Sequence, residues 1–462
     1  MTNICSSASD RDIANHLHPY TNLKKFQDSG PLIITRGKGV RVFDENGKGY
    51  IEGLAGLWCT ALGFGEQRLV DAATRALEQL PFYHSFGGKV AAATIDLAEK
   101  LIDLAPVPMS KAIFSNSGSE ANDTAIKIIW YYNNALGRPR KKKIISRHKA
   151  YHGVTVATGS LTGFANNHRD FDLPIDRILH TSCPHYYRFS ENGETEEEFA
   201  SRCAENLEKM ILDEGPDTVA AFFAEPIMGA GGVIVPPATY FEKIQAALKK
   251  YDVLLLADEV ICGFGRTGNM WGTQTLGMKP DMLTCAKALS SAYIPIAALM
   301  ISEPIYQALV QQSEKLGLFG HGSTYAGHPV AAAVALETLK IYEERNIVEH
   351  VRTVAPRLQD GLRKFAEHPL VGEVRGLGLV AGIELVRDKA TKAPFDAKQG
   401  VGLYFQARAE EEGLIIRPIG DNIAICPPLI TVEDEIDEIL GCLERALNAT
   451  ATWVEENGLT TA

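Results

Sequence analysis

Residues 253–258 read Val-Leu-Leu-Leu-Ala-Asp, a short apolar run that ends in a carboxylate. Two other stretches have the same form: Val-Ala-Ala-Phe-Phe-Ala-Glu at 219–225 and Asp-Met-Leu-Thr-Cys-Ala-Lys at 281–287. The amphipathic residues 239–251, between the first two runs along the chain, are typical of a helix. Near-continuous apolar runs that alternate with helices indicate a parallel sheet covered on both faces. These stretches therefore predict an α/β fold.

An ionisable residue stands at or just after the end of each run. Glu225, Asp258 and Lys287 are 33 and 29 residues apart, about the length of one strand-helix-strand unit. In open α/β sheets, ligands bind outside the carboxyl ends of the strands. Taken alone, Lys287 would be a lysine whose stem lies on apolar surface while its amine reaches water. With two carboxylates expected at the same sheet edge, it is better explained as an active-site lysine.

The surrounding sequence extends this sheet. Apolar runs at 111–115 and 143–146 predict further strands, and the pattern from Glu120 to about Ala135 predicts a helix. We expect a large domain over residues 60–328 with a mostly parallel central sheet.

A smaller α+β domain is expected from the rest of the chain. After about residue 330 the sequence changes to long amphipathic segments, short strand-like pieces and a final helix. A strand-like piece at 39–53 contains a turn at Glu-Asn-Gly-Lys-Gly and is expected to pack with this part. The small domain is therefore expected to comprise residues 1–59 and 329–462.

Composition and charge exclude several classes of function. The 462 residues are 45% hydrophobic and 22% charged, and the length favours two or more domains. The net charge of -11 argues against nucleic acid or an anionic membrane as a partner. The one basic run, at 138–143, is expected to be a solvated turn. No apolar run approaches the ~20 residues that cross a bilayer.

Cysteine and histidine usage predicts a cytoplasmic protein without a metal. The first 20 residues lack a basic region followed by a long apolar one, so no signal peptide is expected. The eight cysteines form no C-x-x-C pair and are expected to be reduced and mostly buried. His148 and His152 are four residues apart, but Gly153 follows and a third ligand is missing. Because metal sites need three or four ligands, we expect none.

Residues 115–123, Ser-Asn-Ser-Gly-Ser-Glu-Ala-Asn-Asp, lead from a predicted strand into a predicted helix. Free N–H groups and the dipole at a helix start favour an anion, and Gly118 would let it approach closely. Ser117 and Ser119 add hydroxyl donors. The same residues also make an ordinary helix N-cap. An active-site lysine at the same sheet edge favours a phosphate site.

Asp258 and Lys287 then suggest which phosphate compound binds. A buried carboxylate needs a partner, because otherwise its pKa rises and it becomes neutral. Pyridoxal phosphate (PLP) offers a protonated ring nitrogen for an aspartate, an aldehyde for a lysine, and a phosphate. Apolar surroundings keep a lysine amine partly neutral and hence nucleophilic. One ligand thus accounts for all three motifs.

Two further stretches were compared with this interpretation. Tyr151-His152-Gly153 follows a predicted strand, and an aromatic ring there could stack on the pyridine face, or both residues are ordinary loop residues. Gly-Phe-Gly-Arg-Thr-Gly at 263–268 matches a dinucleotide fingerprint. That fingerprint needs a following helix, but two more glycines and a proline follow. We therefore expect no nicotinamide site.

Seven motifs in series resemble the class III (fold type I) PLP-dependent aminotransferases, above all the amine:pyruvate, or omega, aminotransferases. They are GLAGLWC at 53–59, NSGSEAND at 116–123, AYHG at 150–153, AEPIMGAGGVIVPP at 224–237, ADEVICGFGRTG at 257–268, AKALSS at 286–291 and GHP at 327–329. The resemblance covers nearly the whole chain, from HLHPYTN at 16–22 to ICPPLI at 425–430. Several motifs at matching intervals are far more specific than one. The resemblance implies PLP as cofactor and an obligate homodimer with two shared sites.

The resemblance also implies a role for the cofactor-binding residues. Lys287 resembles the Schiff-base lysine and proton shuttle, Asp258 the partner of the pyridinium nitrogen, and Glu225 a support of the same hydrogen-bond network. Gly118 and Ser119, with Ser117 beside them, resemble the phosphate cradle. Tyr151 and Val260 resemble the contacts on the two faces of the ring, and His152 adjoins Tyr151. Thr324 resembles the residue that reaches the phosphate of the neighbouring subunit.

For the substrate, the resemblance implies Trp58 and Phe86 as pocket walls beside Tyr151. Arg417 resembles a mobile arginine that pairs with the keto-acid carboxylate and swings away for an uncharged amine. Arginine suits this role because it binds a carboxylate through two parallel hydrogen bonds.

The implied reaction is a ping-pong transfer of an amino group from a primary amine to pyruvate, giving L-alanine and an aldehyde or ketone. Diamines, omega-amino acids such as β-alanine or γ-aminobutyrate, and aryl-alkyl amines all remain open as donors, and the resemblance suggests S stereopreference. Alternatives on the same scaffold are a 2-oxoglutarate-dependent aminotransferase, an aminomutase or a decarboxylase. A PLP-binding protein without turnover is disfavoured by the intact Lys287, Asp258 and Glu225.

Four positions depart from the family pattern: Ser323, Ala292, Lys149 and the pair Gly87-Gly88. They are expected near the substrate mouth or the dimer seam, away from Lys287 and the phosphate cradle. We expect them to alter amine preference through a wider pocket and to leave the reaction type unchanged.

Overall fold

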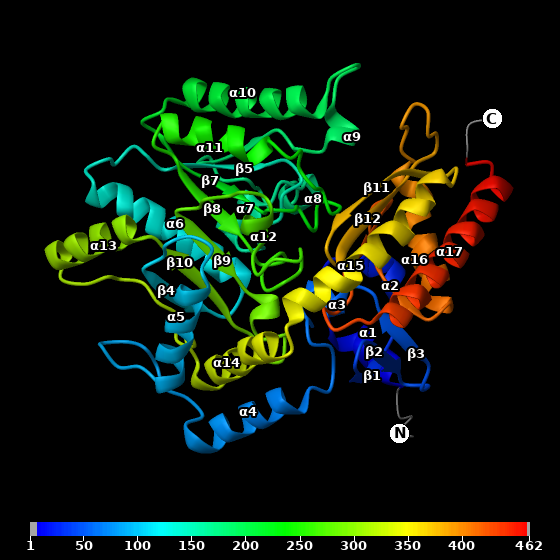
Figure 1. Cartoon of the computed structure of the whole chain (residues 1–462), viewed down its shortest axis with the longest axis horizontal. Helices are drawn as coiled ribbons and strands as arrows, with labels where there is room; N and C mark the ends of the chain where they lie inside the picture. The colour runs from blue at the N-terminus through cyan, green and yellow to red at the C-terminus, as the bar shows by residue number, and fades with distance from the viewer. Residues whose placement is uncertain (1–6, 460–462) are drawn as a thin grey trace.

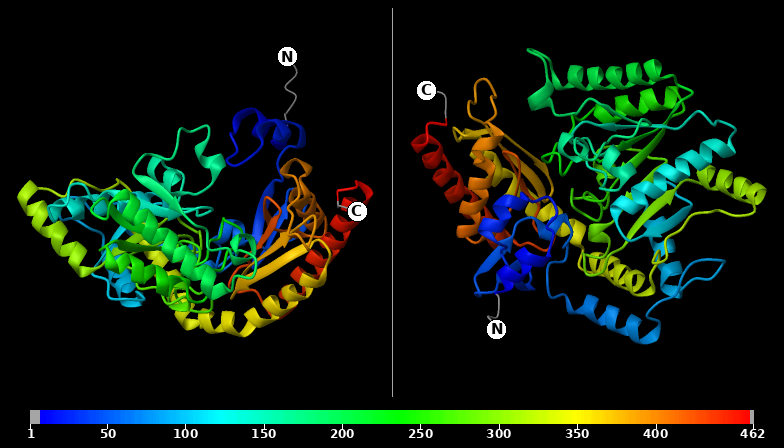
Figure 2. Two further views of the ribbon diagram at one scale, coloured as in Figure 1. Left: turned by 90° about the horizontal axis from the view of Figure 1, so that it is seen from above. Right: turned by 180° about the vertical axis from the view of Figure 1, so that it is seen from behind.

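The computed structural model describes residues 7–459, which fold into two lobes (Figure 1). The large lobe is built on a seven-stranded sheet, and the small lobe on two four-stranded sheets. The first and last described residues, 7 and 459, both belong to the small lobe, and the long helices α14 and α15 run beneath the two lobes (Figure 2). The α/β fold expected from the sequence is confirmed.

The seven-stranded sheet has the order β4-β10-β9-β8-β7-β5-β6. Neighbours from β9 to β6 are parallel, whereas β10 is antiparallel to both β9 and β4. The strands are β4 (Lys111–Ser115), β5 (Lys143–Arg147), β6 (Ile178–Thr181), β7 (Val219–Ala224), β8 (Leu254–Asp258), β9 (Met282–Cys285) and β10 (Ala297–Ile301). The mostly parallel sheet is confirmed. Only a short connection joins β9 to β10, so this pair is antiparallel, because a parallel pair needs a longer crossover.

Helices cover both faces of this sheet. Along β7, Phe222 belongs to the core cluster shared with α10 and α11, whereas the next residue, Phe223, belongs to the cluster shared with α6. This alternation follows from the two-residue period of a strand. The helices of the large lobe are α4 (Gln67–Gln79), α5 (Ala92–Leu104), α6 (Gly118–Ala135), α7 (Val156–Leu161), α8 (Ala165–His168), α9 (Tyr186–Phe189), α10 (Glu196–Glu214), α11 (Tyr240–Lys250), α12 (Gly272–Thr275), η1 (Lys287–Leu289), α13 (Glu303–Leu316) and α14 (Pro329–Glu344).

The small lobe joins the two ends of the chain. Strand β13 pairs in parallel with β3, where Leu414 lies opposite Ile51, so the N-terminal strands pack with the C-terminal part as expected. Its strands are β1 (Ile34–Lys38), β2 (Arg41–Asp44), β3 (Gly49–Glu52), β11 (Val371–Leu377), β12 (Val380–Leu385), β13 (Leu414–Ile415), β14 (Arg417–Ile419) and β15 (Asn422–Ile425). Its helices are α1 (Ala8–Asn15), α2 (Leu23–Ser29), α3 (Ala55–Trp58), α15 (Ile347–Arg363), η2 (Lys364–Glu367), η3 (Ala397–Gln399), α16 (Val401–Glu411) and α17 (Glu433–Glu456).

The chain passes from the large lobe to the small lobe through α14 and α15. Helix α14 packs against α4 and α5, whereas α15 packs against β11 and α17. Asn346, between the two helices, has a left-handed backbone conformation with φ of 50°. The domain limits at residues 59/60 and 328/329 stay predictions.

Two sequence expectations about loops have different outcomes. The basic run at 138–143 is not a fully solvated turn, because Lys141 is buried and its Nζ donates to the carbonyl of Tyr251 over 2.9 Å. The expectation that 263–268 forms a loop is confirmed: the buried Arg266 there donates to the carbonyls of Leu379 and Pro427 and ties the loop to the small lobe.

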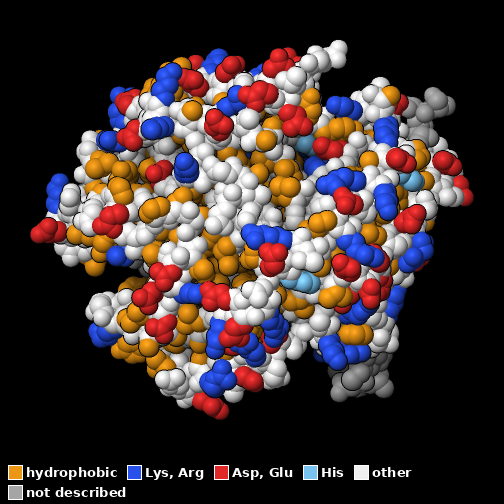
Figure 3. Space-filling model, viewed as in Figure 1, with side chains coloured by type: hydrophobic (Ala, Val, Ile, Leu, Met, Phe, Trp, Pro, Cys, Tyr) orange, Lys and Arg blue, Asp and Glu red, His pale blue; other side chains and the backbone are white. Residues whose placement is uncertain are grey.

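The structure shows how charged side chains are distributed on the surface and whether the cysteines are free and buried. On the face drawn in Figure 3, Lys and Arg side chains alternate with Asp and Glu, and no large area is purely basic. All seven cysteines among residues 7–459 are free, and six are buried; Cys5 lies outside the described residues. No helix within 7–459 has the length and hydropathy of a bilayer-crossing segment.

Candidate active site

A cavity of about 330 Å³ lies at the carboxyl ends of the central parallel strands. This volume falls within the range of small-ligand pockets. Nine of the residues singled out from the sequence line it: Ser117, Gly118, Ser119, Tyr151, His152, Glu225, Asp258, Val260 and Lys287. Residues from β5, β7, β8, β9 and the start of α6 therefore meet in one place, as the positions after the apolar runs predicted.

Lys287 stands two residues after β9, at the start of the short helix η1. Its φ of 49° is left-handed, a conformation that a non-glycine residue adopts at some energetic cost and that clusters at functional sites. Burial lowers the pKa of Lys287, and the negative charge of Asp258 opposes this effect. A lowered pKa leaves more of the amine neutral, which is the nucleophilic and proton-accepting form.

The carboxylate of Asp258 is buried and held by three contacts. Its Oδ2 accepts a hydrogen bond from Asn122 Nδ2 over 2.8 Å and lies 2.8 Å from His152 Nδ1. Its Oδ1 accepts from the backbone N–H of Val260 over 3.2 Å. Asp258 is thus a buried carboxylate whose orientation beside the cavity is fixed by these contacts.

Asn122 is a site residue that the sequence analysis missed. Its Nδ2 also donates to the carbonyl of His152 over 2.9 Å, and its Oδ1 accepts from Thr284 Oγ1 over 3.0 Å. One side chain therefore connects α6, the loop after β5, and the ends of β8 and β9. The available signal was its position within Ser-Glu-Ala-Asn, one turn inside the predicted helix and facing the expected strand ends.

Glu225 supports the site through the backbone. Its Oε1 accepts from the N–H of Tyr151 and its Oε2 from the N–H of Gly229, each over 3.0 Å. Burial raises the pKa of Glu225, and the nearby Asp258 adds to the effect. The sequence led us to expect Glu225 in the network of Asp258. The structure connects the two through Tyr151 and its neighbour His152, without a direct hydrogen bond.

The start of α6 combines a helix cap with a close backbone approach. Ser117 is the N-cap, and its Oγ accepts from the N–H of Glu120 over 3.2 Å, so the capping interpretation holds. A Cβ atom on Gly118 would lie 3.0 Å from Val260 Cγ2, and Ser119 Oγ accepts from the N–H of Val154 over 3.3 Å. The first N–H groups of a helix lack intrahelical partners and can bind an anion.

These residues fit PLP by the chemistry of their donor and acceptor groups. The start of α6 offers N–H and hydroxyl donors for a phosphate, Asp258 a buried anion for a protonated ring nitrogen, and Lys287 an amine for an aldehyde. The buried Nε2 of His152 has no hydrogen-bond partner among the described residues. A polar group bound in the cavity would give such an atom a partner.

The structure places the remaining expected site residues outside the cavity lining. Trp58, whose φ is 66°, is buried in an apolar cluster with Ile261. Ile261 in turn lines the cavity. Arg417, at the start of β14, has its guanidinium carbon 6.0 Å from the ring centre of Tyr20. Its positive charge also acts on the phenol of Tyr151, whose pKa is raised first by burial.

Phe86 and Thr324 lie together elsewhere. Phe86 lines a second cavity, of about 1270 Å³, and its ring would lie 3.2 Å from a Cβ atom on Gly322. Thr324 is exposed two residues further along. Within a single chain, therefore, neither residue reaches the cavity of Lys287, and their expected roles require a second copy of the chain.

The four departures from the family pattern divide between the two cavities. Ala292 lines the cavity of Lys287 and has φ of 62°. Ser323 and Gly87 line the second cavity together with Phe86. Lys149, two residues before Tyr151, lies with its Nζ 5.5 Å from the ring centre of Phe189. The expectation that all of these positions lie away from Lys287 is therefore wrong for Ala292, which lines the same cavity and whose N–H donates to the carbonyl of Lys287 over 3.3 Å.

Comparisons with known proteins agree with this site. A family model described as aminotransferase class-III matches residues 24–447. The chain is 52% identical over 459 residues to gamma aminobutyrate transaminase 1, mitochondrial, of Solanum lycopersicum, which covers 99% of this chain and 89% of that protein. It is 55% identical over 441 residues to the probable gamma-aminobutyrate transaminase 3, mitochondrial, of Oryza sativa subsp. indica, covering 95% and 86%.

Solved structures are similar over almost the whole chain. The omega transaminase from Pseudomonas jessenii in complex with PMP superposes with a TM-score of 0.96 at 57% identity, covering 97% of this chain and 99% of that one. A thermostable omega transaminase variant, W58M/F86L/R417L, engineered for asymmetric synthesis of enantiopure bulky amines, also has a TM-score of 0.96, at 56% identity and with 97% and 100% coverage.

Proposed function

Since the chain belongs to the class III aminotransferases, which use pyridoxal phosphate, we propose that it moves an amino group from a primary amine to pyruvate. The products would be L-alanine and an aldehyde or ketone. The observation that carries this proposal is the cavity in which Lys287 and Asp258 meet, with one arginine, Arg417, beside Tyr151.

The proposed roles follow from the contacts of each residue. When bound, PLP supplies an electron sink that stabilises the negative charge left on a substrate carbon when its proton is removed. Lys287 Nζ would remove that proton and return it at the cofactor carbon. Asp258, held by Asn122 and His152, would keep the ring nitrogen protonated. Gly118 and Ser119 would hold the phosphate, and Tyr151 and Val260 would confine the ring from its two faces.

The charges around the cavity favour an acceptor with a single carboxylate. Lys287 is the only Lys or Arg among the described residues that line the cavity, and Arg417 lies close by. Pyruvate needs one arginine for its carboxylate, whereas 2-oxoglutarate presents two carboxylates and calls for a second cation. The 2-oxoglutarate-dependent enzyme on the same scaffold is the alternative.

The comparisons bear on the donor. The curated plant relatives are named gamma-aminobutyrate transaminases, and the solved relatives omega transaminases. We therefore propose omega-amino acids and other amines whose amino group is distant from a carboxylate as donors. The omega transaminase variant engineered for asymmetric synthesis of bulky amines carries the substitutions W58M, F86L and R417L, which supports Trp58, Phe86 and Arg417 as residues of the substrate pocket.

We also propose that the active enzyme is a homodimer. Exposed apolar residues line the second cavity, among them Phe86, Val90, Ile95 and Leu318. Large exposed apolar patches mark association surfaces. A second copy seated there would bring Phe86 and Thr324 toward the other chain's cofactor. Light scattering should give twice the mass of one chain, and a monomeric yet fully active enzyme would contradict this proposal.

Location is a separate proposal. The free, mostly buried cysteines are typical of a reducing compartment, and we propose the cytoplasm. The plant relatives are named mitochondrial or chloroplastic, so an organelle is the alternative. Fractionation of the source cells distinguishes the two.

The visible absorption of the PLP-loaded enzyme tests the reaction directly. A donor amine added alone should bleach the yellow band of the bound cofactor. Pyruvate added next should restore the band, whereas 2-oxoglutarate should not. If 2-oxoglutarate restored the band and pyruvate did not, pyruvate would not be the acceptor. If no primary amine affected the band, the protein would not be an aminotransferase.

A further inference from the structure

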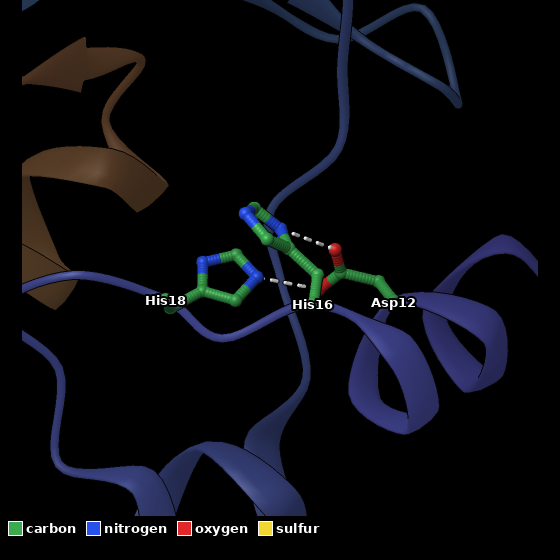
Figure 4. A group of neighbouring side chains, drawn as sticks. All are labelled: Asp12, His16 and His18. Atoms are coloured by element: carbon green, nitrogen blue, oxygen red, sulfur yellow. Dashed lines mark hydrogen bonds and ion pairs between the residues drawn. The ribbon is translucent and has the colours of Figure 1, made fainter.

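Two histidines and one aspartate converge in the N-terminal segment, residues 7–22 (Figure 4). Asp12 lies in the last turn of α1, His16 caps the helix end, and His18 follows two residues later. The Oδ1 of Asp12 lies 3.1 Å from His16 Nδ1, and its Oδ2 lies 2.7 Å from His18 Nε2. The three ligating atoms all lie within 4.8 Å of one another.

Local structure explains this convergence. Residues four apart share one face of a helix, so His16 stands beside Asp12. The ring of His18 packs on Phe26 of α2, with 4.2 Å between ring centres, and on His16, with 4.3 Å. These contacts present a different nitrogen of each imidazole to the same carboxylate. From the sequence we expected no metal site, because only the pair His148 and His152 was considered.

The charge balance of the group favours a cation. Within residues 7–459, the ion-pair partners of Asp12 are the two histidines, and neither Lys nor Arg is among them. A carboxylate and two imidazoles are ligands that zinc-class divalent ions prefer.

A second group of similar composition shows the contrast. His185, Glu373 and Glu384 also bring three ligating atoms together, but this group is already compensated by arginines. Arg375 pairs with both glutamates, and Arg188 pairs with Glu384. A further divalent cation would there face two guanidinium groups. Asp12, His16 and His18 have no such competitor, and their side chains are 23%, 60% and 24% exposed, which leaves room for an ion and its waters.

The group is connected to the cofactor cavity by a short, stiff link. Pro19, whose ring fixes φ, joins His18 to Tyr20. The hydroxyl of Tyr20 accepts a hydrogen bond from Asn167 Nδ2 over 2.6 Å, and its ring lies beside the guanidinium of Arg417. Tyr20 also neighbours Tyr151, which lines the cavity and whose phenol pKa is raised first by burial and then by Tyr20. Whatever fixes His18 therefore also restricts Tyr20.

We propose that Asp12, His16 and His18 bind a divalent transition-metal ion of the zinc class, and that the bound ion fastens the N-terminal segment beside the mouth of the cofactor cavity. Three protein ligands leave at least one coordination position for water. The site does not depend on the proposed reaction, because its ligands lie outside the cavity lining.

Calorimetric titration of the untagged, chelator-washed, PLP-loaded enzyme with ZnCl₂ tests the site. We expect one saturable event per chain, weakened at least ~10-fold in both Asp12→Asn and His18→Gln. The matched control is His350→Gln, because His350 pairs only with the carbonyl of Thr431 and should bind zinc like the wild type. Thermal unfolding of the variants verifies that they fold. No saturable binding, or unchanged binding in both ligand variants, would overturn the site.

Hydrogen exchange tests the fastening. Zinc should slow amide exchange in residues 7–22 at least ~10-fold in the wild type and leave the exchange of His18→Gln unchanged. If zinc binds through Asp12 and His18 while exchange in this segment is unaffected, the fastening is refuted.

Discussion

Asn122 donates its side-chain amide to the buried carboxylate of Asp258 over 2.8 Å, on the same oxygen that His152 Nδ1 contacts. The two residues lie 136 positions apart in the chain. The amide fixes which way the carboxylate points, and because Asn122 also binds the carbonyl of His152, it fixes the loop that supplies the second contact. Asn122 is therefore a positioning residue for Asp258.

Replacement of Asn122 tests this role. Asn122→Ala should lower kcat about 10-fold or more and change the KM for the amine less than ~2-fold, because partners of a functional group typically contribute 10–100-fold. Steady-state kinetics measure both. The control is Asn133→Ala, which removes a buried asparagine of the same helix that bonds only to the carbonyl of Ile129. An equal loss of kcat in both variants would mean a merely structural role.

Replacement of Asp258 tests the buried anion. Asp258→Asn keeps the size of the side chain but removes its charge, and kcat should fall by about 10²–10³-fold, as when one preorganised electrostatic group is lost. The absorption band of the bound cofactor should shift, because the ring nitrogen loses its anionic partner. Asp281→Asn, which changes a carboxylate that binds the N–H of Leu255, should leave the band unchanged. Wild-type kcat in Asp258→Asn would refute the assignment.

Replacement of Arg417 tests acceptor binding. Arg417→Leu should raise the KM for pyruvate about 10–100-fold, because a hydrogen-bonded ion pair with the carboxylate is lost. The KM for an uncharged aryl-alkyl amine should change little. Arg408→Leu is the control, because Arg408 pairs with Glu411 on the surface of the small lobe. If Arg417→Leu affected amine and pyruvate equally, Arg417 would not be the carboxylate-binding residue.

Glu52 predicts a pH dependence of stability. Burial raises the pKa of Glu52 to about 7, although the N–H of Leu54 donates to it over 3.1 Å. Between the ordinary carboxyl pKa of about 4.3 and this value, the folded protein holds a proton that the unfolded chain has released. Stability is therefore lost as the pH rises through this window.

The variant Glu52→Gln cannot ionise. Its melting temperature minus that of the wild type should grow by roughly 2 °C or more from pH 5 to pH 8, measured by thermal unfolding. Glu455→Gln, at an exposed position of α17, should show no such trend. A constant difference across this range would show that Glu52 does not titrate there.

Most of the fold and half of the site follow from local sequence. Continuous apolar runs such as Val219–Ala224 indicated buried parallel strands, and the ionisable residues at their ends indicated that these side chains meet at one edge of the sheet. Strand β10 was not predicted, and an apolar run does not by itself encode the direction of a strand. Lys141 was placed in solvent because a basic run usually is, whereas the structure buries its stem and uses its amine to bind the carbonyl of Tyr251.

The rest of the site depends on contacts between distant residues. Asn122 carries no charge, and its place in the predicted helix indicates only which face it occupies. The tertiary structure identifies Asp258 as its partner. The family resemblance placed Phe86 and Thr324 at the site, yet within one chain they lie away from Lys287. A resemblance does not tell which copy of the chain supplies a residue. Asp12 and His16 have the four-residue spacing of one helix face, but the sequence analysis considered only His148 and His152 as metal ligands. That His18 joins them depends on the turn after the helix, which the sequence pattern does not show.

The most direct test of the account is the site of PLP attachment. Borohydride reduction of the loaded enzyme, followed by digestion and mass spectrometry, locates the modified lysine. We predict the pyridoxyl mass on the peptide that contains Lys287, and none on the peptide that contains Lys141, a lysine that is buried away from the cavity. A label on any other lysine, with Lys287 unmodified, would contradict the central claim.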